Sequence, residues 1–214
     1  MTIALIRVFS TTDPLVKEAH GNIIAKRYGL SVQTYLIPDQ PFGVHDDESE
    51  AVAVPKIVAV AKQAEQAGAK LVLISCAIDP AVAQCRQELT IPVIGAGSAA
   101  AGTAIGLGSR VGVLNLNGTT HPRISAVLGS RFVAEASPSG VKNTTDLLTT
   151  EGKAAAQQAA QELAKQCDVI MLGCTGFSTI ALAAELRRHI SVPVVDAVEA
   201  AGGFAWQVMT EGQQ

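Results

Sequence analysis

One pattern occurs twice in this sequence and constrains the fold more strongly than any other feature. Residues 70–76 read KLVLISC and residues 168–174 read DVIMLGC, so each copy is an apolar run that ends on a cysteine. A turn, a helical stretch and a short strand led by a proline follow in both copies, at Pro92 and at Pro193. An alanine-rich segment comes next, at residues 97–104 and 197–205. The pattern predicts two related halves, residues 1–107 and 108–214, each presenting one thiol.

Strand-like apolar runs alternate with helical stretches along both halves. The predicted strands are residues 3–9, 31–37, 71–75, 92–94, 110–116, 131–135, 169–173 and 193–195. The predicted helices are residues 14–28, 50–67, 80–89, 98–107, 122–128, 151–166, 178–189 and 197–210. Such alternation is typical of an α/β fold with parallel strands. We therefore expect two pseudo-symmetric α/β halves, each a mostly parallel sheet flanked by helices, with the C-terminal helix packed back on the first half.

Three local features carry more specific expectations. Asp79 and Pro80 stand where an N-cap and a first helical residue belong, so Asp79 is expected to cap the helix that follows Cys76. Pro55 is expected in the first turn of its helix or at a break between two helices. The acidic run at residues 46–48 is expected to be a solvated loop.

Composition excludes several classes of function. The net charge is −3 and charged residues make up 16% of the chain, so a concentrated basic face for nucleic acid is not expected. No apolar run approaches the roughly 20 residues of a membrane span. The N-terminus lacks the basic start of a signal peptide, so we expect a cytoplasmic protein with four free thiols. The spacing of the cysteines and histidines matches no zinc site, and we expect no metal.

The repeated motifs resemble those of the Asp/Glu/hydantoin racemase superfamily, and most closely its hydantoin and allantoin racemase branch. The first copy carries Cys76, Asp79-Pro80 and PVIG at residues 92–95, and the second carries LGC at 172–174 and VPVVD at 192–196. The resemblance covers nearly the whole chain. It implies two similar halves with the active site in the cleft between them, a small-molecule substrate and no cofactor. We also expect a homo-oligomer.

The resemblance implies that Cys76 and Cys174 are the two catalytic groups of a racemase or epimerase. Inverting a carbon centre requires a base on one face and an acid on the other, and a thiolate and a thiol supply this pair. Each cysteine precedes a predicted helix start, which is expected to lower its pKa. Polar groups after the strands are expected to bind substrate, namely Ser10, Thr11, Thr12, Ala77, Thr119, Thr120, Thr175 and Gly176. Cys85 and Cys167 have no matching partners and are expected to be structural.

The sequence also bears on the substrate. Glutamate and aspartate racemases of the superfamily usually have a histidine soon after the second cysteine, where this chain has Thr175 and Gly176. A substrate ammonium group is also expected to find few carboxylates in the strand-end loops. Both points favour a neutral or cyclic substrate of hydantoin type.

Four alternatives stay open at this stage. Two are reactions of the same superfamily, a maleate-type cis–trans isomerisation and an arylmalonate-type decarboxylation. A third is a non-catalytic, two-lobed protein that binds a small molecule and does not need paired thiols. The fourth is a nucleotide-binding domain, because Gly95, Gly97 and Ala100 fit a G-x-G-x-x-A pattern after a strand, although no acidic residue stands about 20 positions later.

Overall fold

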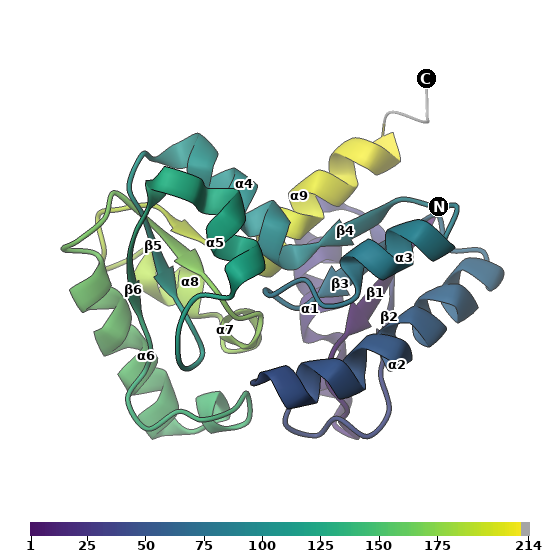
Figure 1. Cartoon of the computed structure of the whole chain (residues 1–214), viewed down its shortest axis with the longest axis horizontal. Coiled ribbons are helices and arrows are strands. Elements are labelled where there is room, and N and C mark those ends of the chain that lie inside the picture. The colour runs from purple at the N-terminus through teal and green to yellow at the C-terminus, as the bar shows by residue number, and fades with distance from the viewer. Residues whose placement is uncertain (211–214) are drawn as a thin grey trace.

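The computed structural model describes residues 1–210 of the 214-residue chain, which fold into two halves of the same architecture (Figure 1). The first half consists of β1 (Thr2–Arg7), α1 (Pro14–Tyr28), β2 (Ser31–Leu36), α2 (Asp47–Gln66), β3 (Leu71–Ser75), α3 (Val82–Glu88), β4 (Val93–Gly95) and α4 (Ala96–Leu107). The second half consists of β5 (Val111–Leu114), α5 (Pro122–Leu128), η1 (Gly129–Arg131), β6 (Phe132–Ala136), η2 (Asp146–Leu148), α6 (Thr150–Leu163), β7 (Val169–Leu172), α7 (Gly176–Thr179), α8 (Leu182–Leu186), β8 (Val194–Val195) and α9 (Ala197–Thr210). The last four residues of the predicted second half, 211–214, lie outside the described residues.

Each half contains a four-stranded parallel sheet, and the two sheets have equivalent strand orders. The orders are β2-β1-β3-β4 and β6-β5-β7-β8. In the first sheet β1 pairs with β2 and β3, and in the second sheet β5 pairs with β6 and β7. The four residues of β7 are fully buried, as expected for a strand with helices on both faces. The predicted fold class is confirmed.

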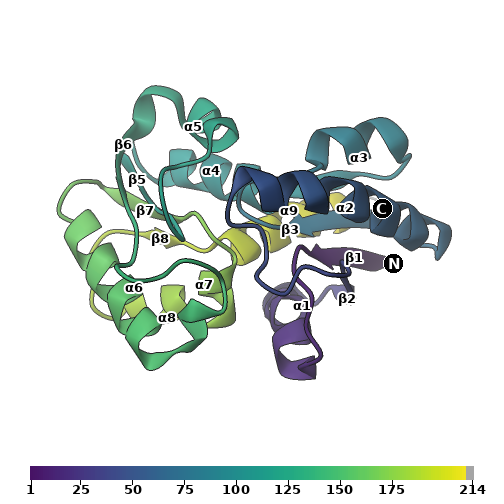
Figure 2. The ribbon, with the colours of Figure 1, turned by 60° about the horizontal axis from the view of Figure 1, so that its bottom comes forward.

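The two alanine-rich helices join the halves by crossing between them. α4 follows the first sheet but packs against β7, β8 and α5 of the second half, and α9 packs against α1, β3 and β4 of the first half. Figures 1 and 2 show α4 lying over the second sheet and α9 over the first. The small side chains of Ala100 and Ala201 are fully buried and belong to one core that includes strands of both sheets. Alanine suits this position because it lets helices approach closely and still removes apolar surface from water.

The turns after the two cysteines differ from the prediction. Pro80 lies in a turn, and α3 begins only at Val82, because Ala81 has a left-handed backbone with φ of 60°. The predicted helix at residues 178–189 is divided into α7 and α8 by Ala181, whose φ is 53°. Ala81 and Ala181 are equivalent, because each directly precedes a helix, α3 or α8. The pseudo-symmetry therefore extends to a left-handed backbone conformation that alanine rarely adopts.

Two further expectations in the first half were wrong. α2 continues across Pro55, which lies in the helix interior rather than in its first turn or at a break. Residues 46–48 do not form a loop: Asp46 is the N-cap of α2, with a reciprocal bond to Ser49, and Asp47 and Glu48 form its first turn. Acidic residues stabilise a helix N-terminus, which accounts for the run.

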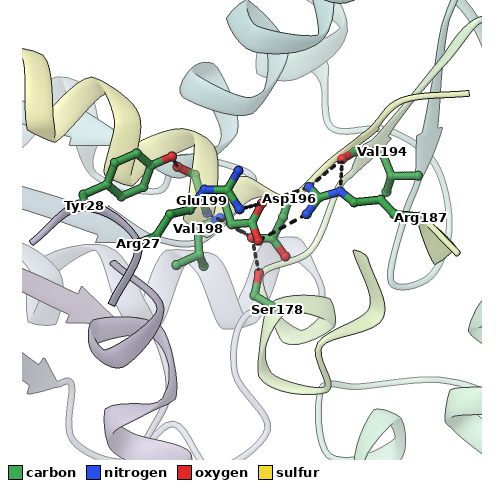
Figure 3. A network of polar contacts seen from close by, with 8 residues as sticks. All are labelled: Arg27, Tyr28, Ser178, Arg187, Val194, Asp196, Val198 and Glu199. Atoms are coloured by element: carbon green, nitrogen blue, oxygen red, sulfur yellow. Dashed lines mark hydrogen bonds and ion pairs between the residues drawn. The ribbon is translucent and has the colours of Figure 1, made fainter. Parts of the chain in front are cut away.

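A polar network at the start of α9 ties the second half to α1 of the first (Figure 3). Asp196 accepts hydrogen bonds from the backbone N–H groups of Val198 and Glu199 and from the hydroxyl of Ser178. The Glu199 carboxylate binds Arg187 and also Arg27 of α1. These contacts fix α9 across the boundary between the halves. Separately, no helix within residues 1–210 is both long and apolar enough to span a membrane.

Candidate active site

The carboxyl ends of the two sheets border one cavity of about 580 Å³, with walls from both halves. Ligands of open α/β sheets bind beyond the carboxyl ends of strands, where the strand order reverses. In these sheets that place lies between β1 and β3 and between β5 and β7. Segments that follow all four strands line the cavity, at residues 7–9, 75–78, 115–119 and 173–176. The architecture therefore concentrates strand-end residues of both halves on one space.

Cys76 and Cys174 both line this cavity and come from different halves. Cys76 directly follows β3, and Cys174 comes two residues after the end of β7. In each case the backbone N–H two positions after the cysteine approaches the sulfur. Gly176 N–H donates to Cys174 Sγ at 3.3 Å, and Ile78 N–H interacts with Cys76. A negative charge on Cys174 raises the pKa of Cys76, so the two sulfur atoms are close enough to influence each other. The structure thus brings together the two thiols that the sequence singled out.

Both thiols are weaker acids than the sequence led us to expect. Burial raises the pKa of Cys76 to about 12 and that of Cys174 to about 11. The side chains keep some surface towards the cavity, but protein atoms surround them closely enough that the loss of water dominates. The nearby backbone N–H groups lower the pKa of each thiol, as predicted, but by less than burial raises it. The expectation of a lowered pKa at these turns was therefore wrong.

The predicted polar groups divide into two sets. Four of them line the cavity, namely Ala77, Thr119, Thr175 and Gly176. The hydroxyl of Thr175 donates to the Ser75 carbonyl oxygen at 3.2 Å, which links the turn after β7 to the end of β3. Its hydrogen is therefore engaged within the protein, although its oxygen can still accept a bond.

The other four predicted groups are absent from the cavity wall, and the hydroxyls of Ser10, Thr11 and Thr120 have partners within the protein. The oxygen of Ser10 accepts a bond from Gln40 N–H, and that of Thr11 accepts one from Asp13 N–H. Thr12 is exposed on the same turn, which leads away from β1 towards α1. Thr120 is buried and bonded to Asn115. These four residues shape turns and do not contact the cavity.

Arg7 is a cavity residue that the sequence analysis did not identify. It ends β1, and only 3% of its surface is exposed. Its guanidinium donates to the Val16 carbonyl oxygen and to Thr179 Oγ1, and it lies 5.8 Å from the centre of the Phe9 ring. The available signal was a single cation in an otherwise apolar strand.

A buried histidine continues this polar arrangement across the boundary between the halves. His20 of α1 is fully buried, with Nδ1 2.8 Å from the Ser75 hydroxyl and Nε2 2.9 Å from Thr179 Oγ1. Burial and the charge of Arg7 hold the pKa of His20 well below its usual value, so the ring is neutral. The network connects the residue before Cys76 with the short helix that follows Cys174.

The N-terminus of α2 adds carboxylates to the opposite part of the wall. Asp46, Asp47 and Glu50 line the cavity together with His45 and His121. Glu50 is largely buried, bonds to Arg123 and lies 3.5 Å from His121 Nε2, so this contact also joins the two halves. As expected, the strand-end segments that line the cavity contain no carboxylate, and the carboxylates of the wall come from the start of α2 instead. Within residues 1–210, no three His, Cys, Asp or Glu side chains gather as a metal site.

The start of α4 argues against the nucleotide-binding alternative. Asp79 does not cap its own helix; its carboxylate accepts bonds from Gly97 N–H at 2.6 Å and Ser98 N–H at 2.8 Å, at the N-terminus of α4. A phosphate would need these N–H groups. A side chain at Gly97 would also overlap the carbonyl oxygen of Ala77, so this glycine serves close packing. The G-x-G pattern is therefore structural.

A family model described as Asp/Glu/Hydantoin racemase matches residues 10–205. The chain belongs to the Asp/Glu/hydantoin racemase family. The predicted resemblance is confirmed, and so is the expectation that the chain is an isomerase of the racemase type.

Individual relatives agree with this assignment. The chain is similar to a hydantoin racemase of Rhizobium meliloti, with 29% identity over 99% of this chain and 90% of the relative. It is also similar to a hydantoin racemase of Pseudomonas sp. (strain NS671), with 25% identity over 81% of this chain and 72% of the relative. The crystal structure of an allantoin racemase from Pseudomonas fluorescens shares the fold, with a TM-score of 0.86 and 22% identity over 99% of this chain and 92% of that chain.

Proposed function

We propose that this family member racemises a small cyclic ureide of hydantoin type, with Cys76 and Cys174 as the two acid/base groups and without a cofactor. The observation that carries the proposal is the presence of two thiols, one from each half, on one cavity. The influence of Cys174 on the pKa of Cys76 supports their proximity. The similarity to hydantoin racemases supports the substrate class. A volume of about 580 Å³ is ample for a five-membered ring with a substituent.

The reaction transfers one proton at each sulfur. A thiolate takes the proton from the ring carbon beside the carbonyl group, an S–H bond forms, and the C–H electron pair moves towards the carbonyl oxygen to give an enolate. The opposite thiol then gives its proton to the other face of the carbon, and its own S–H bond breaks. The protonation states of the two sulfurs are exchanged, and reaction of the opposite enantiomer restores them.

The environment of the thiols suits a weakly acidic carbon. A raised pKa makes each thiolate a stronger base, which favours removal of a proton from carbon, while it reduces the fraction of thiolate present. The hydroxyl of Thr119 on the cavity wall is the polar group that we assign to a substrate carbonyl or the enolate oxygen.

The test is racemisation of single enantiomers of 5-substituted hydantoins and of allantoin, followed by polarimetry. Cys76→Ser and Cys174→Ser are each expected to reduce the rate by about 10³-fold, because each removes one proton-transfer group. The matched control is Cys167→Ser, since Cys167 lies outside the cavity wall and donates to the Leu163 carbonyl oxygen, a bond that serine can also make. Full activity of either cavity variant would overturn the assignment.

The remaining alternatives are tested with other substrates and readouts. Loss of maleate absorbance would indicate a cis–trans isomerase, and release of carbon dioxide from an arylmalonate would indicate a decarboxylase. Binding of a hydantoin without turnover, unchanged in both cysteine variants, would indicate a binding protein. Each of these results replaces the proposed reaction.

A further inference from the structure

Arg7 is a buried cation without an acidic partner. Among residues 1–210, no carboxylate oxygen lies within 4.0 Å of the Arg7 guanidinium, the distance limit for an ion pair. The hydrogen-bond partners of Arg7 are neutral oxygens of Val16 and Thr179. Burial lowers the pKa of Arg7 only to about 10, so the group stays charged near neutral pH. Buried charges in proteins are usually paired, because the loss of hydration is costly. The environment of Arg7 therefore lacks a counter-ion on the protein side.

The position of Arg7 identifies which thiol can serve as that counter-ion. Arg7 lines the same cavity as Cys174 and is bonded to Thr179, at the end of the short helix α7 that begins two residues after this cysteine. A negative charge on Cys174 raises the pKa of Arg7, and Glu18 of α1 has a smaller effect in the same direction. The other ionisable group of the network, His20, is neutral.

The surroundings of the two thiols are electrostatically unequal. The cation of Arg7 lowers the pKa of Cys174, and Gly176 N–H donates to its sulfur at 3.3 Å. Cys76 receives one N–H group, from Ile78, and the negative charges of Cys174, Asp79 and Glu50 raise its pKa. A cation near this turn, Arg123, is paired with Glu50 and donates to the Ile78 carbonyl oxygen. The pseudo-symmetric cavity thus has one wall that favours a thiolate and one that disfavours it.

We propose that Arg7 is a positioning residue that selects Cys174 as the thiol that ionises first, while Cys76 retains its proton. In the racemase cycle proposed above, on which this inference rests, Cys174 is then the base of the resting enzyme and Cys76 the acid. The enantiomer whose proton faces Cys174 is processed first from the resting state. The assignment uses the geometry of this chain and does not depend on which compound is the substrate.

The experiment measures alkylation by iodoacetamide, a neutral probe that reacts with the thiolate, at each cysteine between pH 7.5 and 9. Digestion and mass spectrometry give separate rates for Cys76 and Cys174 in the same molecule. The test variant is Arg7→Met, which removes the charge and keeps an unbranched side chain. The matched control is Arg86→Met, because Arg86 also binds a backbone carbonyl oxygen, that of Val93, but lies away from the cavity wall.

Removal of the cation is expected to slow alkylation of Cys174 by about tenfold, since a nearby opposite charge shifts a pKa by one unit or more. The rate at Cys76 is expected to change by less than about twofold, because Arg7 is not among the groups that shift the pKa of this thiol. Arg86→Met should leave both rates as in the wild type. Equal slowing of both cysteines, or of neither, overturns the inference.

If Arg7→Met does not fold, the pH order of alkylation in the wild type decides the matter, and Arg7→Lys serves as a second variant. Arg7→Lys keeps a cation and is expected to leave the rate at Cys174 within about threefold of the wild type, although lysine is bonded differently. In the wild type, Cys174 should become reactive at a lower pH than Cys76 as the pH is raised. The reverse order would itself overturn the assignment. The readout needs no turnover. Racemisation could therefore fail while the selective effect of Arg7 persists, and the two proposals are tested separately.

Discussion

The most informative single substitution outside the thiols is Asp79→Asn. Asp79 stands in the turn after Cys76 but holds the N-terminus of α4 with both carboxylate oxygens: Oδ1 accepts from Gly97 N–H and Oδ2 from Ser98 N–H. The residue is largely buried, and its φ is 55°, a left-handed conformation that asparagine adopts readily. The substitution therefore removes the charge and one accepting oxygen without straining the backbone.

The expected cost follows from these contacts. Asparagine has one oxygen, so one buried N–H group must face the side-chain NH₂ group, which costs about 1–3 kcal/mol. Loss of a negative charge at a helix N-terminus adds about 0.5–1 kcal/mol. The two contributions sum to about 1.5–4 kcal/mol, and we expect a value near the middle of this range, about 2–3 kcal/mol. For a chain of this size, this loss lowers Tm by about 5–10 °C, measurable by circular dichroism.

Asp13→Asn is the matched control for this prediction. Asp13 caps α1 at an exposed position and accepts both of its bonds, from Leu15 and Val16, through the single oxygen Oδ1. Asparagine retains such an oxygen and is as good an N-cap as aspartate, so Tm should change by less than about 2 °C. If Asp79→Asn were as mild as Asp13→Asn, the buried two-oxygen cap described here would be wrong. The Asp79 charge also raises the pKa of Cys76, so Asp79→Asn should speed alkylation of Cys76.

Two further predictions concern pH. Racemisation should accelerate about tenfold per pH unit between pH 7 and 9, because only a thiolate can accept the proton and burial raises the pKa values of Cys76 and Cys174 to about 12 and 11. A rate that polarimetry shows to be independent of pH would exclude thiol bases. Unfolding free energy should fall as pH drops below about 6.5, because buried His20 has a lowered pKa and stays neutral when folded but binds a proton when unfolded. In urea titrations, His20→Asn should reduce this slope by up to about 1.4 kcal/mol per pH unit, and the exposed His189→Asn should not.

Much of the fold follows from patterns that depend on short segments. The apolar runs that end at Cys76 and Cys174 predicted two buried parallel strands, and the sheets have these strands in equivalent positions. Carboxyl ends of parallel strands lie on one edge, so a strand-end cysteine in each half was enough to predict a thiol near a ligand crevice. The alanine-rich segments predicted helices, and α4 and α9 follow them closely.

The parts that sequence did not predict depend on contacts between distant segments. Asp79 satisfies the usual pattern for an N-cap, but its partners are 18 and 19 residues away, in a helix that packs beside its turn. Arg7 interacts with Thr179, which no local pattern connects to β1. The carboxylate of Glu50 reaches the cavity because α2 starts beside the second half, where Arg123 holds it. Local patterns contain no information about such pairings.

The differences between the two thiol environments bear on function more directly than their symmetry does. The repeat supplies two equivalent thiols, but in a perfectly symmetric cavity neither would ionise before the other, and a racemase needs one base and one acid at a time. Unlike residues of the first half surround these equivalent positions: Arg7 lies towards Cys174, whereas Asp79 and Glu50 lie towards Cys76. Each difference acts in the same direction on the pair. In the proposed mechanism, this difference in charge lets two side chains of the same type serve as proton acceptor and proton donor.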